Sequence, residues 1–150
     1  MITDIIHFHL VDKRIATGGQ PTASQIDELQ RAGYDVLISM AKDDHFDNLV
    51  DEANLASTMT MEYVFIPVVM KEPLLDDFDK FSKTMEYFRD KKVFVHCNAN
   101  KRTSVFVALW RILSDKADFD EAMSHVTEVW EPNDIWTSFI EDVLKHYRSK

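Results

Sequence analysis

The sequence contains few of the residues that build disulfides, metal clusters and flexible linkers. It has one cysteine, three glycines and four prolines among 150 residues. A single cysteine excludes an internal disulfide and any site built from several cysteine ligands, and it fits a reducing compartment. The chain has no internal repeat and no low-complexity stretch, and its length is typical of one domain. We therefore expect one domain that spans residues 1–150.

Positive charge and long apolar runs are also scarce. The 17 Lys and Arg residues are outnumbered by 26 Asp and Glu residues, which gives a formal net charge of -9. Such a surface disfavours nucleic acid and anionic membranes as partners, although a locally positive pocket can still bind an anionic substrate. No apolar run approaches the roughly 20 residues that span a membrane. The first residues, "MITDIIHFHLVDKR", lack the apolar core of a signal peptide. We expect a soluble, cytoplasmic protein.

Strand-like and helix-like segments alternate through the first two thirds of the chain. The expected strands are solidly apolar, a pattern that predicts a mostly parallel sheet covered by helices on both faces. Thr22 and Gln25 form a capping-box pattern before a helix that ends at Gly33. The expected strands lie at 15–17, 34–40, 61–68 and 91–97, and the expected helices at 22–33, 47–57, 78–88, 102–114 and in two later segments. The fold class is thus α/β, with about four to five strands and a helical C-terminal third.

Several side chains are assigned to faces by this pattern. In the helix over 47–57, Val50, Ala53 and Ala56 are expected to point inward, whereas the acidic stretch "KDDHFDNLVDE" is expected to be a solvated helix start. Its spacing matches no standard metal-ligand pattern. Further apolar residues are assigned to the core of the two last helices, namely Phe119, Ala122, Met123, Val126, Trp130, Ile135, Trp136, Phe139, Ile140, Val143 and Tyr147.

The segment "VFVHCNANKRTS", residues 93–104, has a pattern that favours anion binding. Cys97 ends an apolar strand, and the helix begins near Arg102. Loop amides and a helix N-terminus together bind tetrahedral anions, and the same field stabilises a thiolate. Arg102 can grip two anion oxygens, and the Thr103 hydroxyl can donate to the cysteine sulfur. The candidate catalytic residues are Cys97, Arg102 and Thr103, and the candidate phosphate-binding residues are Asn98, Ala99, Asn100, Lys101 and Arg102.

A lone cysteine at a strand end often serves only as packing. Here the neighbouring residues favour a functional role. Lys101 and Arg102 stand at a helix start, where the helix dipole disfavours cations, and a bound anion would remove this conflict.

The segment "VHCNANKRTS" resembles the signature loop of the cysteine-dependent protein tyrosine phosphatase superfamily, which includes the dual-specificity phosphatases. The chain is most similar to the bacterial DUF442 family, the phosphatase-like domain also attached to beta-lactamase-hydrolase-like proteins. The segments "RIATGGQPT", "YVFIPV" and "VHCNANKR" carry this resemblance, which covers about residues 10–115, and "VWEPNDIW" resembles a segment near the end of a phosphatase branch of the family.

The resemblance implies a protein tyrosine phosphatase-like fold and hydrolysis of a phosphomonoester through a phosphocysteine on Cys97. It implies no cofactor and no metal. The implied partners are a phosphorylated small molecule or a phosphoprotein, with phosphotyrosine among the candidates, and an oxyanion such as phosphate or sulfate in the loop.

The loop departs from the superfamily pattern in its length. The superfamily has five residues between cysteine and arginine, usually including a glycine, whereas this chain has four and no glycine. Asparagine can replace the glycine, because it enters left-handed conformations more readily than most residues. The shorter loop resembles that of rhodanese-type sulfurtransferases. A persulfide carrier on Cys97 and a non-catalytic oxyanion-binding module are therefore alternative hypotheses.

The proton donor is left open by the sequence. The stretch "PVVMKEPLLDD" offers Glu72, Asp76 and Asp77, of which the two aspartates are equally suited to begin the next helix. Asp43 and Asp44 follow another apolar strand. Glu131 and Asp134 lie in "EPND".

Overall fold

The computed structural model describes residues 1–41 and 51–149 and contains a central sheet of five strands. The strands are β1 (His9–Leu10), β2 (Ile15–Gly18), β3 (Val36–Ser39), β4 (Glu62–Phe65) and β5 (Val93–His96). Their order in the sheet is β1-β2-β5-β3-β4, and all neighbours are parallel except β1 and β2. This arrangement confirms the predicted mostly parallel sheet, to which the short strand β1 adds an antiparallel edge.

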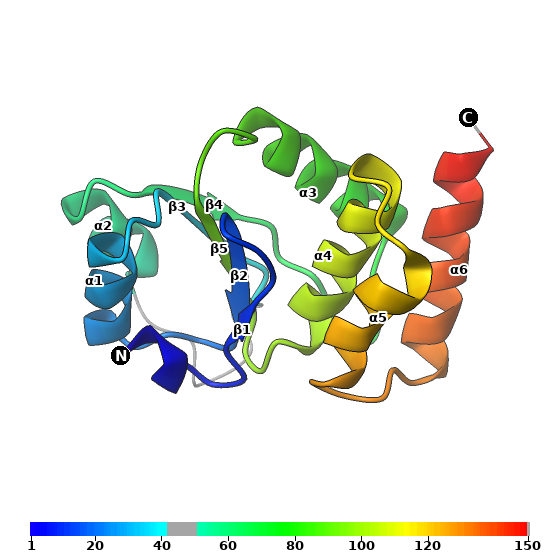
Figure 1. Ribbon diagram of the computed structural model, residues 1–150, viewed down its shortest axis with the longest axis horizontal. Helices are drawn as coiled ribbons and strands as arrows, with labels where there is room; N and C mark the ends of the chain where they lie inside the picture. The colour runs from blue at the N-terminus through cyan, green and yellow to red at the C-terminus, as the bar shows by residue number, and fades with distance from the viewer. Residues whose placement is uncertain (42–50, 150) are drawn as a thin grey trace.

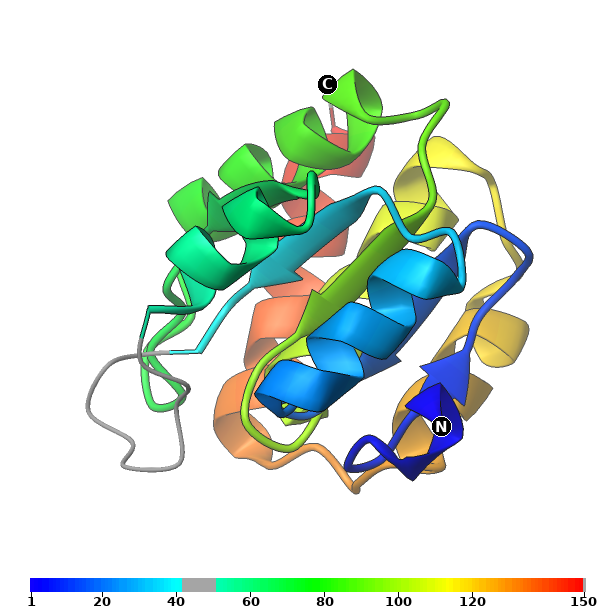
Figure 2. The ribbon, with the colours of Figure 1, turned by 90° about the vertical axis from the view of Figure 1, so that its left-hand side faces the viewer.

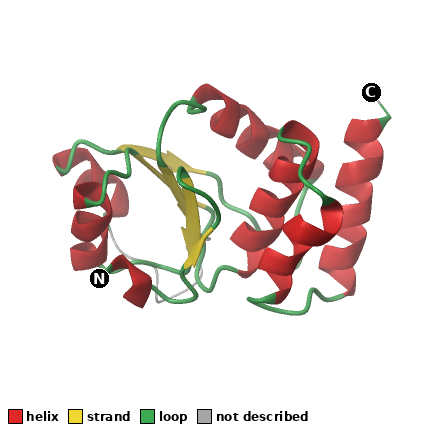
Figure 3. Cartoon of the chain, in the orientation of Figure 1, coloured by secondary structure: helices red, strands yellow, loops and turns green. Residues whose placement is uncertain are grey.

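Helices cover both faces of the sheet (Figures 1 and 3). The helix α1 (Ala23–Arg31), the helix α2 (Glu52–Thr58) and the short 3-10 helix η1 (Ile2–Asp4) lie on one face. On the other face lie α3 (Leu75–Tyr87), α4 (Lys101–Ser114), α5 (Phe119–Thr127) and α6 (Asp134–Arg148). In the view of Figure 2, α1 lies in front of the strands, and α5 and α6 lie behind them. The helical C-terminal third is as expected.

Two apolar clusters follow from the alternation of side chains along the strands. Within β3, Val36 and Ile38 join the larger cluster under α3 to α6, whereas Leu37 points to the smaller cluster under α1 and α2. Because β2, β3 and β5 consist of buried residues, both of their faces are covered. In contrast, β4 has exposed residues at both ends because it is an edge strand.

The prediction of α1 from its capping residues is confirmed. The Thr22 hydroxyl accepts from the Gln25 N–H, the Gln25 side chain accepts from the Thr22 N–H, and Gly33 has a φ of 94° just after the helix. The prediction for α2 was partly wrong. This helix begins at Glu52, and it buries Glu52 and Ala56 while Ala53 is exposed. Val50 lies outside the described residues.

The assignment of the last two helices to the core was correct for most residues. Trp136, Phe139, Ile140 and Val143 are buried, but Phe119 in the first turn of α5 and Ile135 in the first turn of α6 are exposed. Trp130 and Tyr147 are half-buried and pack against the larger cluster. No helix within residues 1–41 and 51–149 is long and apolar enough to cross a membrane.

Candidate active site

Cys97 follows the central strand of the sheet. Its strand, β5, pairs with β2 on one side and β3 on the other, so Cys97 lies at the carboxyl ends of three parallel strands. The Cys97 N–H lies 3.4 Å from the Gly18 carbonyl oxygen, and the residue is 1% exposed. Sites of α/β proteins occur at this edge of the sheet.

The end of β2 packs directly against the loop that begins at Cys97. Gly19 and Ala99 form a bridge, and the Gln20 N–H donates to the Asn98 carbonyl over 3.0 Å. A Cβ atom on Gly19 would lie 2.4 Å from the Asn98 carbonyl oxygen, closer than any real contact. A glycine is therefore required here, and this explains the Gly-Gln-Pro segment in physical terms.

Asn100 supplies the left-handed turn of the loop. It precedes α4 with a φ of 66° and is fully buried. Its side-chain Nδ2 donates to the His7 carbonyl over 2.9 Å and to the Thr17 hydroxyl over 3.0 Å. The expectation that asparagine can replace the missing glycine in a left-handed conformation is confirmed at this residue.

The Arg102 guanidinium lies between the Cys97 loop and the loop after β4. Its Nη1 donates to the Val68 carbonyl over 2.8 Å, and its Nη2 donates to the Asn98 side-chain oxygen over 2.6 Å. These bonds use two of the five guanidinium N–H donors. Arg102 is 7% exposed, so its charge lies in a largely desolvated environment.

The neighbouring residues of α4 have other partners. The Lys101 ammonium lies 5.6 Å from the centre of the Trp130 ring. The fully buried Thr103 hydroxyl donates to the Met40 sulfur over 3.8 Å, and the Ser104 hydroxyl donates to the Lys101 carbonyl over 3.0 Å. A hydrogen bond from Thr103 to the Cys97 sulfur stays a prediction.

A buried polar cluster behind Cys97 was missed by sequence reasoning. The Nε2 atom of His96 lies 2.6 Å from Glu52 Oε2, and the Gln20 Nε2 atom donates to Glu52 Oε1 over 2.6 Å. His96 is 0% and Glu52 6% exposed. The expectation of a solvated helix start is thus wrong for Glu52. The pattern of neighbouring residues does not reveal such a glutamate, because the side chains that bind Glu52 are distant from it in the sequence.

The candidate proton donors differ in their environments. Glu72 and Asp76 are exposed, and Asp76 pairs with Lys80 over 3.2 Å. Asp77 is 9% exposed, its Oδ2 accepts from the Leu74 N–H over 3.0 Å, and burial raises its pKa.

None of the other candidate proton donors is buried among the described residues. Glu131 and Asp134 are exposed, and Asp43 and Asp44 lie outside the described residues. Within residues 1–41 and 51–149, no group of three or more His, Cys, Asp or Glu side chains is arranged to hold a metal ion.

The model of the family described as "DSP-PTPase phosphatase fused to NAD+ Kinase" matches residues 5–134. A search of curated proteins found no match.

Solved structures give close matches over nearly the whole chain. A DUF442 protein from Shewanella putrefaciens CN-32 is 27% identical, with a TM-score of 0.88 over 97% of this chain and 96% of its own. PTPMT1 in complex with PI(5)P is 16% identical, with a TM-score of 0.79 over 95% of this chain and 97% of its own. A variant of TpbA from P. aeruginosa in complex with pTyr is 15% identical, with a TM-score of 0.73 over 97% of this chain and 92% of its own. The last two matches are likenesses of fold.

Proposed function

The chain belongs to the family of dual-specificity-type phosphatases described as fused to NAD+ kinase, and from this membership we propose that it hydrolyses a phosphomonoester with Cys97 as nucleophile. The fold is that of the protein tyrosine phosphatase superfamily.

The observation that carries the proposal is the position of Arg102. Its buried guanidinium is bonded to Asn98 in the loop that begins at Cys97, and it is held from the other side by the Val68 carbonyl. A permanent cation held against a cysteine loop at the ends of parallel strands is suited to bind phosphate oxygens beside the sulfur. A merely structural cysteine has no use for such a charge.

The proposed reaction has two steps. The Cys97 thiolate attacks phosphorus in line, the bond from phosphorus to the ester oxygen breaks, and an acid protonates the leaving oxygen. Water then attacks the phosphocysteine, which releases inorganic phosphate and returns the thiolate, with Thr103 as the proposed donor to the departing sulfur. Arg102 and the amides of residues 98–102 stabilise the charge on the phosphate oxygens. Of the candidate acids between β4 and the first turn of α3, we propose Asp77 as the proton donor, because burial raises its pKa.

The proposed substrate is a phosphorylated small molecule or a phosphoprotein. Relatives of the same fold bind PI(5)P and pTyr, and both ligands carry phosphomonoesters. These ligands support the phosphomonoester class.

The test compares the wild-type protein with Cys97→Ser on p-nitrophenyl phosphate. This substrate has a good leaving group, so the result does not depend on which acid acts. We expect turnover by the wild-type protein and a loss of roughly a thousandfold or more in the variant. Acid quenching should trap phosphate on Cys97, and Thr22→Ala, a change in the distant cap of α1, is the control for handling and stability.

Other outcomes would contradict the proposal. Equal rates in the wild-type protein and Cys97→Ser would exclude Cys97 as nucleophile. Phosphate binding without turnover would favour the non-catalytic module. Sulfane sulfur gained by Cys97 from thiosulfate, in a protein without phosphatase activity, would favour the persulfide carrier.

A further inference from the structure

The side chain of Lys101 points away from the cysteine loop. Lys101 is the first residue of α4 and directly precedes Arg102. Arg102 is buried against Asn98 and the Val68 carbonyl, whereas Lys101 is exposed. The Lys101 ammonium lies 5.6 Å from the centre of the Trp130 ring, in the segment between α5 and α6. The proposed reaction uses the backbone amide of Lys101, and the charge of its side chain has no part in it.

The Trp130 ring gives the Lys101 ammonium a defined position. The segment that carries Trp130 passes beside the amino-terminal end of α4 (Figure 1). Trp130 is half-buried, and its ring packs edge-on against Trp136 with 6.0 Å between the ring centres. The Trp136 Nε1 atom in turn donates to the Met70 carbonyl in the loop after β4. Since the face of an aromatic ring attracts an ammonium within about 6 Å of its centre, the anchored ring holds the lysine beside the candidate site.

The charge of Lys101 is not balanced by a carboxylate in the described part of the chain. In contrast, Lys80 and Lys83 of α3 each pair with an aspartate one turn earlier. The neighbouring Arg102 carries a like charge, and the dipole of α4 disfavours a cation in its first turn. An anionic group of a substrate would relieve both conflicts.

The two cations at the start of α4 are directed to different places. The Arg102 guanidinium is turned inward to Asn98 and Val68, and the Lys101 ammonium is turned toward Trp130. One phosphate group at Arg102 therefore leaves the ammonium available for a second group. Consecutive Cα atoms are only about 3.8 Å apart, so both groups can belong to one small substrate. A lysine ammonium is a compact charge on a flexible stem, which suits a carboxylate or a phosphate.

We propose that Lys101 is a specificity-determining residue that binds a second anionic group, a carboxylate or a phosphate, of a substrate whose phosphomonoester lies at Arg102. The inference rests on the proposed function, because it places a phosphomonoester in the Cys97 loop. It narrows the substrate class to phosphomonoesters with a further negative charge close to the ester. A small molecule with two anionic groups meets this condition, and so does a phosphoprotein with an acidic residue beside the phosphorylated one.

The test measures binding, so it needs no turnover. Benzylphosphonate resembles an aryl phosphate with a CH₂ group in place of the ester oxygen, and 3-carboxybenzylphosphonate adds one carboxylate. Calorimetry gives the dissociation constants of both compounds for the wild-type protein, Lys101→Met and Lys101→Arg. We expect the wild-type protein to bind the carboxylated compound about fivefold more tightly than benzylphosphonate. Lys101→Met, which keeps an unbranched stem beside Trp130, should lose this preference, and Lys101→Arg should keep it.

A control variant and a change of salt test whether the effect is local. The matched control is Lys91→Met, which removes an exposed lysine just before β5, at the other end of this strand from Cys97. This variant should keep the preference of the wild-type protein. Added salt should weaken the preference, because exposed charges are screened.

A second pair of ligands identifies the source of the second anionic group. These ligands are peptides that carry phosphonomethyl-phenylalanine between two alanines or between two glutamates. A preference for the glutamate peptide that is lost in Lys101→Met would support the inference with a phosphoprotein as substrate. A preference confined to 3-carboxybenzylphosphonate would support it with a small molecule as substrate.

The inference and the proposed function can fail separately. An unchanged preference in Lys101→Met, or a wild-type protein without a preference in either pair of ligands, would overturn the inference. If such a protein still hydrolyses p-nitrophenyl phosphate through Cys97, the proposed function stands. The expected preference in a protein without turnover would instead contradict the proposed catalysis alone.

Discussion

Two residues allow the cysteine loop to adopt its conformation, namely Asn100 within the loop, just before α4, and Gly19 just after β2. Within the loop, Asn100 adopts the left-handed turn and fixes it by bonds to His7 and Thr17. Gly19, at the end of β2, lets its backbone approach the cysteine loop closely, because a Cβ atom at this position would not fit against the Asn98 carbonyl. A loop without its own glycine therefore depends on a glycine from the neighbouring strand.

This dependence predicts the effect of Gly19→Ala. The added methyl group must displace the loop backbone at Asn98, the residue that also bonds to Arg102, and a misplacement of about 1 Å costs about a hundredfold in rate. We expect kcat/KM for p-nitrophenyl phosphate to fall by this amount. The control is Gly33→Ala, where the methyl group has room but φ is positive, so about 1 kcal/mol of stability is lost and activity is kept. Equal activity in the two variants would contradict this role of Gly19.

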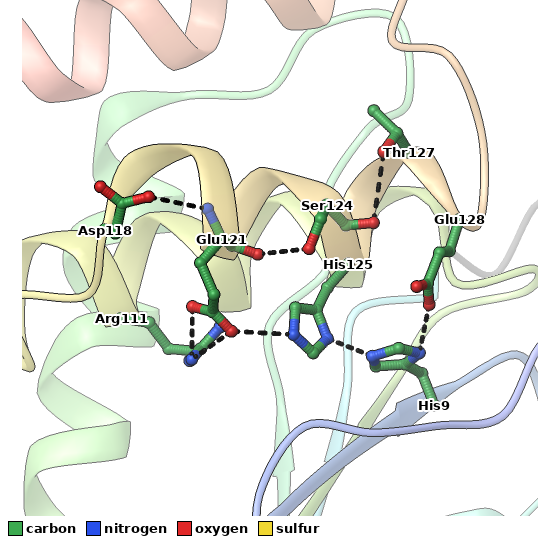
Figure 4. A network of polar contacts seen from close by, with 8 residues as sticks. All are labelled: His9, Arg111, Asp118, Glu121, Ser124, His125, Thr127 and Glu128. Carbon is green, nitrogen blue, oxygen red and sulfur yellow. Dashed lines mark hydrogen bonds and ion pairs between the residues drawn. The ribbon is translucent and has the colours of Figure 1, made fainter.

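At the scale of elements, β1 is attached to α5 by a polar network (Figure 4). His9 of β1 contacts His125 of α5, and its Nδ1 atom lies 3.2 Å from a carboxylate oxygen of Glu128. His125 in turn lies 3.1 Å from Glu121, which also pairs with Arg111 of α4. The pKa of His9 is lowered, chiefly by burial and next by the nearby His125. Two facing imidazoles cannot both be charged without repulsion.

The network predicts a loss of stability at mildly acidic pH. The pKa of His9 is below its ordinary value of 6.5 in the folded protein, so the unfolded chain binds the proton more readily as pH falls through 6.5. The stability is therefore present above pH 6.5 and decreases below it. We expect the thermal midpoint of the wild-type protein to fall between pH 7.5 and 5.5, and His9→Gln to flatten this slope. The slope should be kept in His146→Gln, which changes an exposed histidine of α6. Identical slopes in all three proteins would exclude His9 as the cause.

The sequence predicts those parts of the fold and of the candidate site that are determined by residues close together in the chain. Neighbouring residues determine the cap of α1 at Thr22, the buried strands β2, β3 and β5, and the resemblance to the phosphatase superfamily. All three are confirmed. The bond between Glu52 and His96 joins residues 44 positions apart, and neither residue type indicates the other. The Val68 carbonyl that holds Arg102 is backbone, so no side chain can signal it. Tertiary packing alone determines these contacts.

At the scale of the molecule, the C-terminal helices support the candidate site from behind the sheet. Trp136 of α6 is fully buried, and its Nε1 donates over 2.8 Å to the carbonyl of Met70. Met70 lies two residues after Val68, whose carbonyl accepts from Arg102. The loop after β4 is thus held between α6 and the guanidinium of α4. Trp130 adds a second link, because its ring packs on Trp136 and faces the Lys101 ammonium.

This coupling predicts that Trp136→Phe impairs the site from a distance. Phenylalanine keeps a ring in the core but leaves the Met70 carbonyl without its donor, which costs about 1–3 kcal/mol and frees the loop that holds Arg102. We expect a several-fold loss of kcat/KM besides the loss of stability. The matched control is Trp110→Phe in α4, because Trp110 is equally buried and its Nε1 has no hydrogen-bond partner among the described residues. Urea unfolding and steady-state kinetics on both variants separate the two effects. If the variants lose stability to different extents but retain the same kcat/KM, α6 stabilises the fold without positioning Arg102.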